Sequence, residues 1–339
     1  MTHFARASGT PAPAADRVLV TGATGQDGSY LVDRLIDEGA EVHALVRPGD
    51  DATTDLTRRH PEIVLHTGDL ADQHTAQTLV ADSQPDEIYH LAGISSVALS
   101  WQQPVATAAV TGLATAALLQ AAWQHAERTG GPVAFVQAAS AEIFGAPAVS
   151  PQDETTPIAP VNPYGAAKAY AHHLVGVYRG RGLHASSAIL YNHESPRRPD
   201  AFVTRKITRA VAAIALGATD ELVLGNQESR RDWGWAPDYV DAMIRMARHR
   251  RAADFVIATG RAHSVRDFVM AAFVAAGIAD WQRHVRTDPA LYRPVDATEL
   301  VGDATRARRE LGWRPTVDFA ELVARMVRAD LDALGTSVG

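Results

Sequence analysis

The sequence predicts an α/β protein built on a doubly wound parallel sheet, with a smaller C-terminal lobe interleaved with it. Short apolar runs alternate with helical segments through the first half, and a glycine-rich loop joins the first strand to the first helix. From about residue 195 the pattern becomes basic, proline-containing and less regular. We therefore expect a first domain at 16–190, a second lobe mainly at 191–339, and a disordered leader at 1–15.

Apolar runs bounded by glycine or polar residues predict the strands of the sheet. The first run, at 17–21, is followed by a helix at 26–38 that has Leu31, Val32 and Leu35 on one face and is ended by Gly39. Further strands are predicted at 41–46, 63–66, 87–91, 133–138 and 185–190, and further helices at 105–125, 163–179 and 318–334. Parallel strands place their carboxyl ends at one edge of the sheet, so ligands are expected there.

The composition limits the possible partners. The chain has 339 residues, with 32 Lys and Arg against 39 Asp and Glu and a net charge of −7, which disfavours nucleic acid and anionic membrane surfaces. It contains no cysteine, which excludes disulfides, cysteine-held metals and a thiol nucleophile. No apolar run long enough to cross a bilayer and no secretory signal are predicted, so we expect a cytoplasmic location.

The loop between the first strand and the first helix has the features of a dinucleotide site. Glycines there allow a tight turn and a close approach of the backbone to a pyrophosphate, and the helix N-terminus supplies free N–H groups. This strand–loop–helix context predicts a Rossmann fold. The predicted cofactor-binding residues of the loop are Gly22, Thr24, Gly25, Gln26, Asp27 and Gly28.

The end of the second strand indicates which dinucleotide binds. An acidic residue there would bind a ribose hydroxyl and favour NAD, but the sequence has Arg47 and no acid before Asp50. An arginine suits a 2′-phosphate, so we predict NADP, with NAD as the less favoured alternative. Asp69 and Leu70 follow the third strand and are placed beside the adenine, although an acid there equally suits a turn or a helix cap.

The segment at 162–168 predicts a catalytic helix. Asn162 is a good N-cap and Pro163 a good first helical residue. Tyr164 and Lys168 are four residues apart, so they share a helical face. A nearby ammonium lowers the pKa of a phenol, and a tyrosine activated in this way takes a proton from a hydroxyl while hydride leaves the same carbon.

Ser140 and Glu142 follow the fifth strand, at the edge where a nicotinamide is expected. The serine is placed to bond the oxygen that Tyr164 deprotonates. A simple alcohol oxidation needs only one base, and a second carboxyl can remove a carbon-bound proton and protonate a leaving hydroxyl. Glu142 therefore favours a dehydration over a plain dehydrogenation.

Taken together, these residues resemble the extended short-chain dehydrogenase/reductases and, within them, the GDP-mannose 4,6-dehydratases. The most specific motif is Asn-His-Glu-Ser-Pro-Arg-Arg at 192–198, and the resemblance covers nearly the whole chain from 17 to 331. The other matching segments are 20–31, 137–145, 202–209, 231–234, 255–260 and 292–294.

The resemblance implies an internal redox cycle on a nucleotide-diphosphate hexose, with a GDP-linked hexose preferred. Tyr164, with Lys168, would deprotonate O4 as hydride moves from C4 to NADP. Glu142, assisted by Ser140, would remove the C5 proton and help expel the C6 hydroxyl before the hydride returns to C6. It also implies cofactor contacts at Leu91 and Ala92, and substrate contacts at Ser95, Asn192, Val203, Lys206, Arg231, Arg293 and Asp296. The basic side chains of this set suit two phosphates, and some of the basic residues at 197–209 are expected on a solvated charged face.

The sequence departs from the family pattern at several positions. Ile94 replaces a glutamine, Asn162 replaces the serine of Arg-Ser-Pro-Tyr, and Asp296 replaces a glutamate. The Arg-Arg-Ser-Ser loop that helps bind cofactor across a tetramer interface is here Arg-Pro-Gly-Asp at 47–50. A homo-oligomer is still expected, with dimer and tetramer both open.

Alternatives to this function remain open at the level of sequence. An epimerase or 4-keto reductase on the same fold needs Tyr164 and Lys168 but not Glu142, and a dehydratase could take a different nucleotide hexose. A sensor without turnover should have lost these side chains. A metal hydrolase is disfavoured because His172 and His173 point to different helix faces and no His-Glu-x-x-His spacing occurs. We predict no metal ligands.

Overall fold

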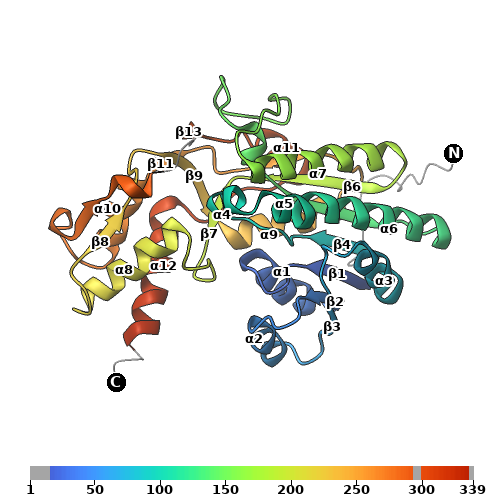
Figure 1. Ribbon diagram of the computed structural model, residues 1–339, viewed down its shortest axis with the longest axis horizontal. Helices are drawn as coiled ribbons and strands as arrows, with labels where there is room; N and C mark the ends of the chain where they lie inside the picture. The colour runs from blue at the N-terminus through green and yellow to red at the C-terminus, as the bar shows by residue number, and fades with distance from the viewer. Residues whose placement is uncertain (1–15, 293–298, 336–339) are drawn as a thin grey trace.

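A seven-stranded parallel sheet organises the first lobe of the protein (Figure 1), here described from a computed structural model. The structure describes residues 16–292 and 299–335, so the predicted leader at 1–15 lies outside it. The strand order is β10-β6-β5-β4-β1-β2-β3, and the chain reverses its direction of travel between β1 and β4. The strands are β1 (Arg17–Thr21), β2 (Glu41–Val46), β3 (Val64–Thr67), β4 (Glu87–His90), β5 (Ala134–Ser140), β6 (His184–Leu190) and β10 (Phe255–Ile257).

Helices cover both faces of this sheet, as a doubly wound fold requires. On one face, Leu31, Val32 and Met243 belong to the core that holds α1 (Gln26–Asp37), α9 (Ala236–Arg248) and α11 (Thr305–Leu311). On the other face, Leu118 and Val175 belong to the core that holds α3 (Gln73–Ser83), α6 (Ala114–Thr129) and α7 (Pro163–Gly180). The predicted fold class is confirmed.

The smaller lobe has its own apolar core. Phe268, Phe273 and Leu322 lie in a cluster formed largely by α8 (Val203–Ala215), α10 (Val265–Ala275) and α12 (Phe319–Gly335), which Figure 1 shows gathered at the left. Its strands are β7 (Asn192–Glu194), β8 (Leu222–Leu224), β9 (Arg230–Trp235), β11 (Ala262–Ser264), β12 (Val285–Thr287) and β13 (Glu299–Leu300). Two short 3₁₀ helices, η3 (Gln282–His284) and η4 (Pro289–Leu291), flank β12.

Segments from the second half of the sequence complete the first lobe. Strand β10 pairs with β6, and α9 and α11 pack on the same sheet face as α1. A chain that crosses between lobes in this way is interleaved, although a division at residue 190 stays a prediction. The remaining helices of the first half are α2 (Ala52–Arg59), α4 (Val97–Gln102), α5 (Pro104–Thr107), the π-helix η1 (Ala108–Leu113) and the 3₁₀ helix η2 (Ala141–Phe144).

The prediction that no apolar stretch is long enough to cross a bilayer is wrong by length and composition alone. Within the described residues, the continuous stretch Pro104–Thr129, made of α5, η1 and α6, is long and apolar enough to cross a bilayer by length and composition. Its apolar character comes from many small alanines, which do not stand out as one long run. Half of its most apolar window is buried, and Leu118 and Leu119 pack into the core, so the stretch reads as a core helix.

Candidate active site

A cleft of about 740 Å³ lies at the carboxyl edge of the parallel sheet, between the two lobes. The first lobe contributes the loops that follow β1 to β5, and the second contributes β7, the start of α8 and part of β9. The cleft therefore lies where strand order reverses, which is the usual ligand position in an open α/β sheet.

The glycine loop is shaped for a close-fitting ligand. A side chain on Gly28 would place its Cβ 2.0 Å from the carbonyl oxygen of Gly22, and one on Gly22 would come within 2.8 Å of the amide of Ala92. Gly22 also has φ +75°, which favours glycine. Gly25 caps α1 without a side-chain bond, so the first N–H groups of the helix are free. These residues fit the pyrophosphate of a dinucleotide.

The other predicted cofactor residues line the same cleft: Thr24, Arg47, Asp69, Leu70, Leu91 and Ala92. Thr24 donates a hydrogen bond to Asp50, with 2.8 Å between the oxygens, and this bond ties the loop after β1 to the loop after β2. Asp69 accepts a bond from the backbone of Ala71, so it also has the turn role that the sequence left open.

Gln26 and Asp27 bridge the two lobes through their side chains. Asp27 pairs with His193 across 2.8 Å, and Gln26 bonds the His193 carbonyl and Ser195. Burial alone would raise the pKa of Asp27, but the His193 imidazolium outweighs it and holds that pKa below its usual range. Burial would likewise lower the pKa of His193, and Asp27 raises it. This buried ion pair holds the cofactor loop against β7.

The four predicted catalytic residues come together in the cleft. Ser140 ends β5, Glu142 lies in η2, and Tyr164 and Lys168 lie on α7. Ser140 Oγ accepts a hydrogen bond from the backbone N–H of Glu142 at 3.3 Å. The Lys168 ammonium donates to the Ala138 carbonyl at 2.6 Å and lies 5.9 Å from the centre of the Tyr164 ring.

Burial dominates the electrostatics of this group. It raises the pKa of Tyr164 to about 12, against a lowering by the Ser140 hydrogen bond. It lowers the pKa of Lys168 to about 8, against a raising by Asp27. We expected Lys168 to lower the pKa of Tyr164. Burial controls that pKa instead, because desolvation of the phenolate outweighs the nearby positive charge. The protein side chains alone leave Tyr164 protonated at neutral pH.

The substrate side of the cleft contains five of the predicted contacts. Ser95, Asn192, Val203, Lys206 and Arg231 all line it, from segments far apart in the sequence. Arg293 and Asp296 lie outside the described residues. Lys206 is exposed toward the cleft, and no carboxylate of residues 16–292 or 299–335 forms an ion pair with it. Its ammonium is therefore available for a phosphate.

Most of the basic run at 197–209 has structural partners. Arg197 pairs with Asp33 at 2.7 Å, and Arg205 pairs with the buried Asp330 at 2.8 Å. Arg209 forms an ion pair with Asp200. Some residues of this run were expected on a solvated charged face, and three of its arginines are instead paired with carboxylates of α1, α12 and the loop before α8. Lys206 and Arg198 are its members that line the cleft as basic groups.

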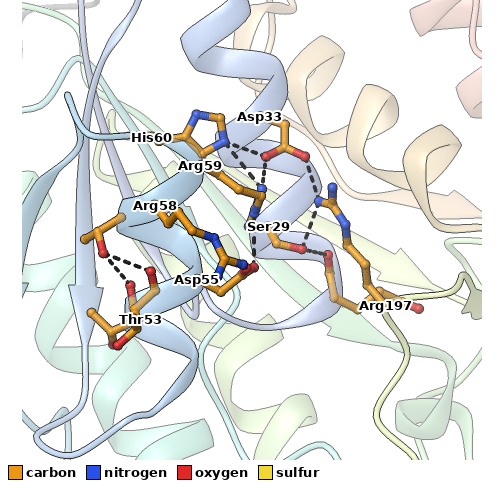
Figure 2. A network of polar contacts seen from close by, with 11 residues as sticks. Ser29, Asp33, Thr53, Asp55, Arg58, Arg59, His60 and Arg197 are labelled. Carbon is orange, nitrogen blue, oxygen red and sulfur yellow. Dashed lines mark hydrogen bonds and ion pairs between the residues drawn. The ribbon is translucent and has the colours of Figure 1, made fainter. Parts of the chain in front are cut away.

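Figure 2 shows how Arg197 is anchored on the first lobe. Its guanidinium donates to Ser29 at 3.2 Å, pairs with Asp33, and lies over the ring of Tyr30, 3.9 Å from its centre. Asp33 also contacts His60 at 2.7 Å and Arg59. Arg197, which follows β7, is therefore fixed to α1, and through Asp33 to the end of α2.

The sequence did not reveal three residues of the site. His193 pairs with an acid 166 positions away, and no local pattern predicts such a contact. Arg198 stacks on Phe202 with 3.7 Å between guanidinium and ring centre and pairs with Glu194 at 3.2 Å. Asn162 was identified only as a helix cap, but it also bonds Glu142.

Comparison with known proteins decides the family. A family model described as GDP-mannose 4,6 dehydratase matches residues 19–326. GDP-mannose 4,6 dehydratase 1 of Arabidopsis thaliana is 43% identical over 93% of this chain and 89% of its own length. The chain belongs to the GDP-mannose 4,6-dehydratase family. The human GDP-mannose 4,6 dehydratase is 41% identical, covering 94% of this chain and 92% of the relative.

Solved structures support the fold of this family member. The UDP-glucose 4-epimerase of Thermus thermophilus, in complex with NAD, has a TM-score of 0.79 at 27% identity, covering 93% of this chain and 98% of that one. The UDP-glucose 4-epimerase of Thermotoga maritima has a TM-score of 0.83 at 24% identity, covering 94% and 99%. The resemblance stated from the motifs is confirmed, and the epimerase or reductase alternative is not favoured. Within the described ranges, no three His, Asp or Glu side chains are placed to share a metal ion.

Proposed function

We propose that this chain is a nucleotide-sugar 4,6-dehydratase, a hydro-lyase that converts GDP-mannose to GDP-4-keto-6-deoxymannose. The observation that carries the proposal is the presence of Glu142 beside Ser140, Tyr164 and Lys168 in one cleft. Three of these residues suffice to oxidise and reduce an alcohol, and the additional carboxylate is what an elimination needs.

The cofactor in this proposal is a nicotinamide dinucleotide, with NADP preferred. The glycine loop fits its pyrophosphate, and Arg47 is exposed on the loop after β2 and suits a 2′-phosphate. Held by the glycine loop and Arg47, the cofactor would supply a hydride acceptor for C4 of the hexose and a hydride donor for C6. No net oxidation occurs, so one bound cofactor serves many turnovers.

The side chains divide the proton transfers between them. Tyr164 receives the O4 proton, with Ser140 bonding the same oxygen and Lys168 supplying positive charge nearby. Glu142 takes the C5 proton and passes it to the C6 hydroxyl, which leaves as water. The proton that Tyr164 received from O4 goes to C5 when hydride returns to C6. Asn192, Val203, Lys206 and Arg231 would hold the nucleotide diphosphate from the second lobe. Arg293 and Asp296, outside the described residues, complete the proposed set.

An isotope experiment tests this function directly. We expect GDP-mannose deuterated at C4 to give a 4-keto product carrying deuterium at C6, without net formation of reduced cofactor. Net reduction of the cofactor, or unchanged sugar, would contradict the proposed function. UDP-, dTDP- and CDP-hexoses tested in parallel would show whether the guanine nucleotide is preferred.

Changing Arg47 tests the choice of cofactor. We expect Arg47→Ala to weaken NADP binding by about tenfold or more, with a smaller effect on NAD, because one charge-assisted contact to a phosphate is lost. Isothermal titration with each cofactor measures this. Arg58→Ala is the control, since Arg58 is an exposed arginine of α2 paired with Asp55. Equal losses for NADP and NAD would contradict the proposed role of Arg47.

A homo-oligomer is proposed from an exposed apolar surface on α4 to α7. Val105 is 81% exposed and Trp101 50%, and Leu113, Tyr170 and Val177 are also exposed. Figure 1 shows these helices along one side of the first lobe. Apolar side chains gathered in this way mark an interaction surface, and a second copy is the partner we propose. Sedimentation equilibrium would give the number of subunits.

We also propose a cytoplasmic location, in keeping with a chain that has no cysteine.

A further inference from the structure

Asn162 makes two hydrogen bonds with different roles. It is the N-cap of α7 and is only 7% exposed. Its side-chain oxygen Oδ1 accepts a bond from the backbone N–H of Gly165 at 2.8 Å. Its amide nitrogen Nδ2 donates to carboxylate oxygen Oε2 of Glu142, also at 2.8 Å. One side chain thus connects the start of the catalytic helix to the proposed base.

The hydrogen-bonding partners fix the orientation of this amide. A backbone N–H can only donate, so Oδ1 must face Gly165. The opposite side of the amide is then a donor, and it faces Glu142. A carboxylate oxygen accepts hydrogen bonds, so the donor side of the amide and Oε2 of Glu142 match.

The backbone around this pair is held by close packing. A Cβ on Gly165 would lie 2.5 Å from the carbonyl oxygen of Glu142, so α7 can approach η2 only because residue 165 is glycine. Gly145, at φ +65°, turns the chain after η2, and a Cβ there would lie 2.0 Å from the carbonyl oxygen of Ala159. The amide of Ala159 in turn bonds the carbonyl of Ile143 at 3.0 Å. The distance between Asn162 and Glu142 is therefore set by packed backbone.

We propose that Asn162 is a positioning residue that holds Oε2 of Glu142 and leaves Oε1 free to take the C5 proton. The inference rests on the proposed function, in which Glu142 is that base. Within the described part of the chain, no side chain other than Asn162 bonds the Glu142 carboxylate. A glutamate has several rotatable bonds, and fixing one oxygen restricts where the other can point.

A serine at position 162 would separate the two roles of Asn162. A serine caps a helix about as well as asparagine does. Its hydroxyl, however, lies one bond short of the place that Nδ2 occupies, so it keeps the bond to Gly165 and does not reach Glu142. Asn162→Ser therefore separates the helix cap from the contact with the base.

Two variants and a control test the proposal in the full-length enzyme with its cofactor bound. Asn162→Ser removes the amide donor, and Asn162→Asp keeps the cap but places a second carboxylate against Glu142. Asp318→Ala is the control, because it removes a helix cap at α12, outside the cleft. Rapid mixing with GDP-mannose follows reduced nicotinamide by absorbance and product by quenching.

We expect Asn162→Ser to slow product formation by about 10- to 100-fold, the loss expected for one hydrogen bond to a charged group. Hydride removal should keep its rate, so reduced nicotinamide builds up. Asn162→Asp should be slower still, and Asp318→Ala should match the unaltered enzyme in all of these measurements.

Two results would overturn the inference. One is Asn162→Ser forming product within about twofold of the unaltered enzyme, with no build-up of reduced nicotinamide. The other is an equal slowing of hydride removal and product formation, which would assign Asn162 to the helix alone. Failure of the proposed function is separate from both, since it would appear in the unaltered enzyme as no transfer of deuterium from C4 to C6.

Discussion

Replacing Glu142 with glutamine should reduce turnover by roughly 10³-fold, the range expected on loss of a general base, while hydride removal from C4 continues. Glutamine has nearly the same shape and can still accept the bond from Asn162, so the geometry is kept and only the base is lost. The cofactor should then become reduced once per active site and stay reduced. A single-turnover experiment that follows nicotinamide absorbance and sugar product measures both outcomes.

Glu154→Gln is a matched control for this experiment. Glu154 lies outside the cleft and accepts a bond from the backbone of Val256 at 2.8 Å. The same substitution there should leave dehydration within about twofold of the unaltered enzyme. Near-normal dehydration by Glu142→Gln would show that another group removes the C5 proton. Loss of hydride removal together with elimination would show that Glu142 acts before the elimination step.

More of the fold than of the site could be predicted from the sequence, because local patterns determine most strands and helices. The strand at 41–46 was predicted to the residue, because a buried parallel strand reads as a continuous apolar run. Strand β10, three residues long, was not predicted as part of the sheet. Its place beside β6 depends on a return of the chain from the second lobe, and no local signal carries that information.

The site shows the same division between local and distant information. Tyr164 and Lys168 were found because four-residue spacing on a helix places both on one face. The ion pair of Asp27 with His193 joins two motifs that were each identified, but their contact depends on how the lobes close. The sequence could not show which basic residues at 197–209 are paired, because the acidic partners Asp33 and Asp330 lie far away in the sequence.

Lys168→Met should remove activity and yet stabilise the folded protein. Loss of the ammonium beside Tyr164 should lower turnover by about 10²-fold or more. Lys168 is only 4% exposed, and burial lowers its pKa from 10.5 to about 8, which corresponds to a cost of about 3 kcal/mol for the charged form in the folded state. Methionine removes that cost but leaves the Ala138 carbonyl without its donor, a loss of about 1 kcal/mol. The expected net gain at neutral pH is about 2 kcal/mol.

The pH dependence of this gain identifies its cause. Below the folded pKa of about 8, Lys168 is charged in both states and the full cost is present. Between about 8 and 10.5 the unfolded chain binds the extra proton, so the unaltered protein gains stability with rising pH and the advantage of methionine shrinks. Above that range the charge cost is gone, and the unaltered protein should be more stable than the variant by about 1 kcal/mol, the hydrogen bond to Ala138. Denaturant unfolding of both proteins, with matched cofactor content, measures the difference. A constant advantage at every pH would instead assign the gain to better apolar packing.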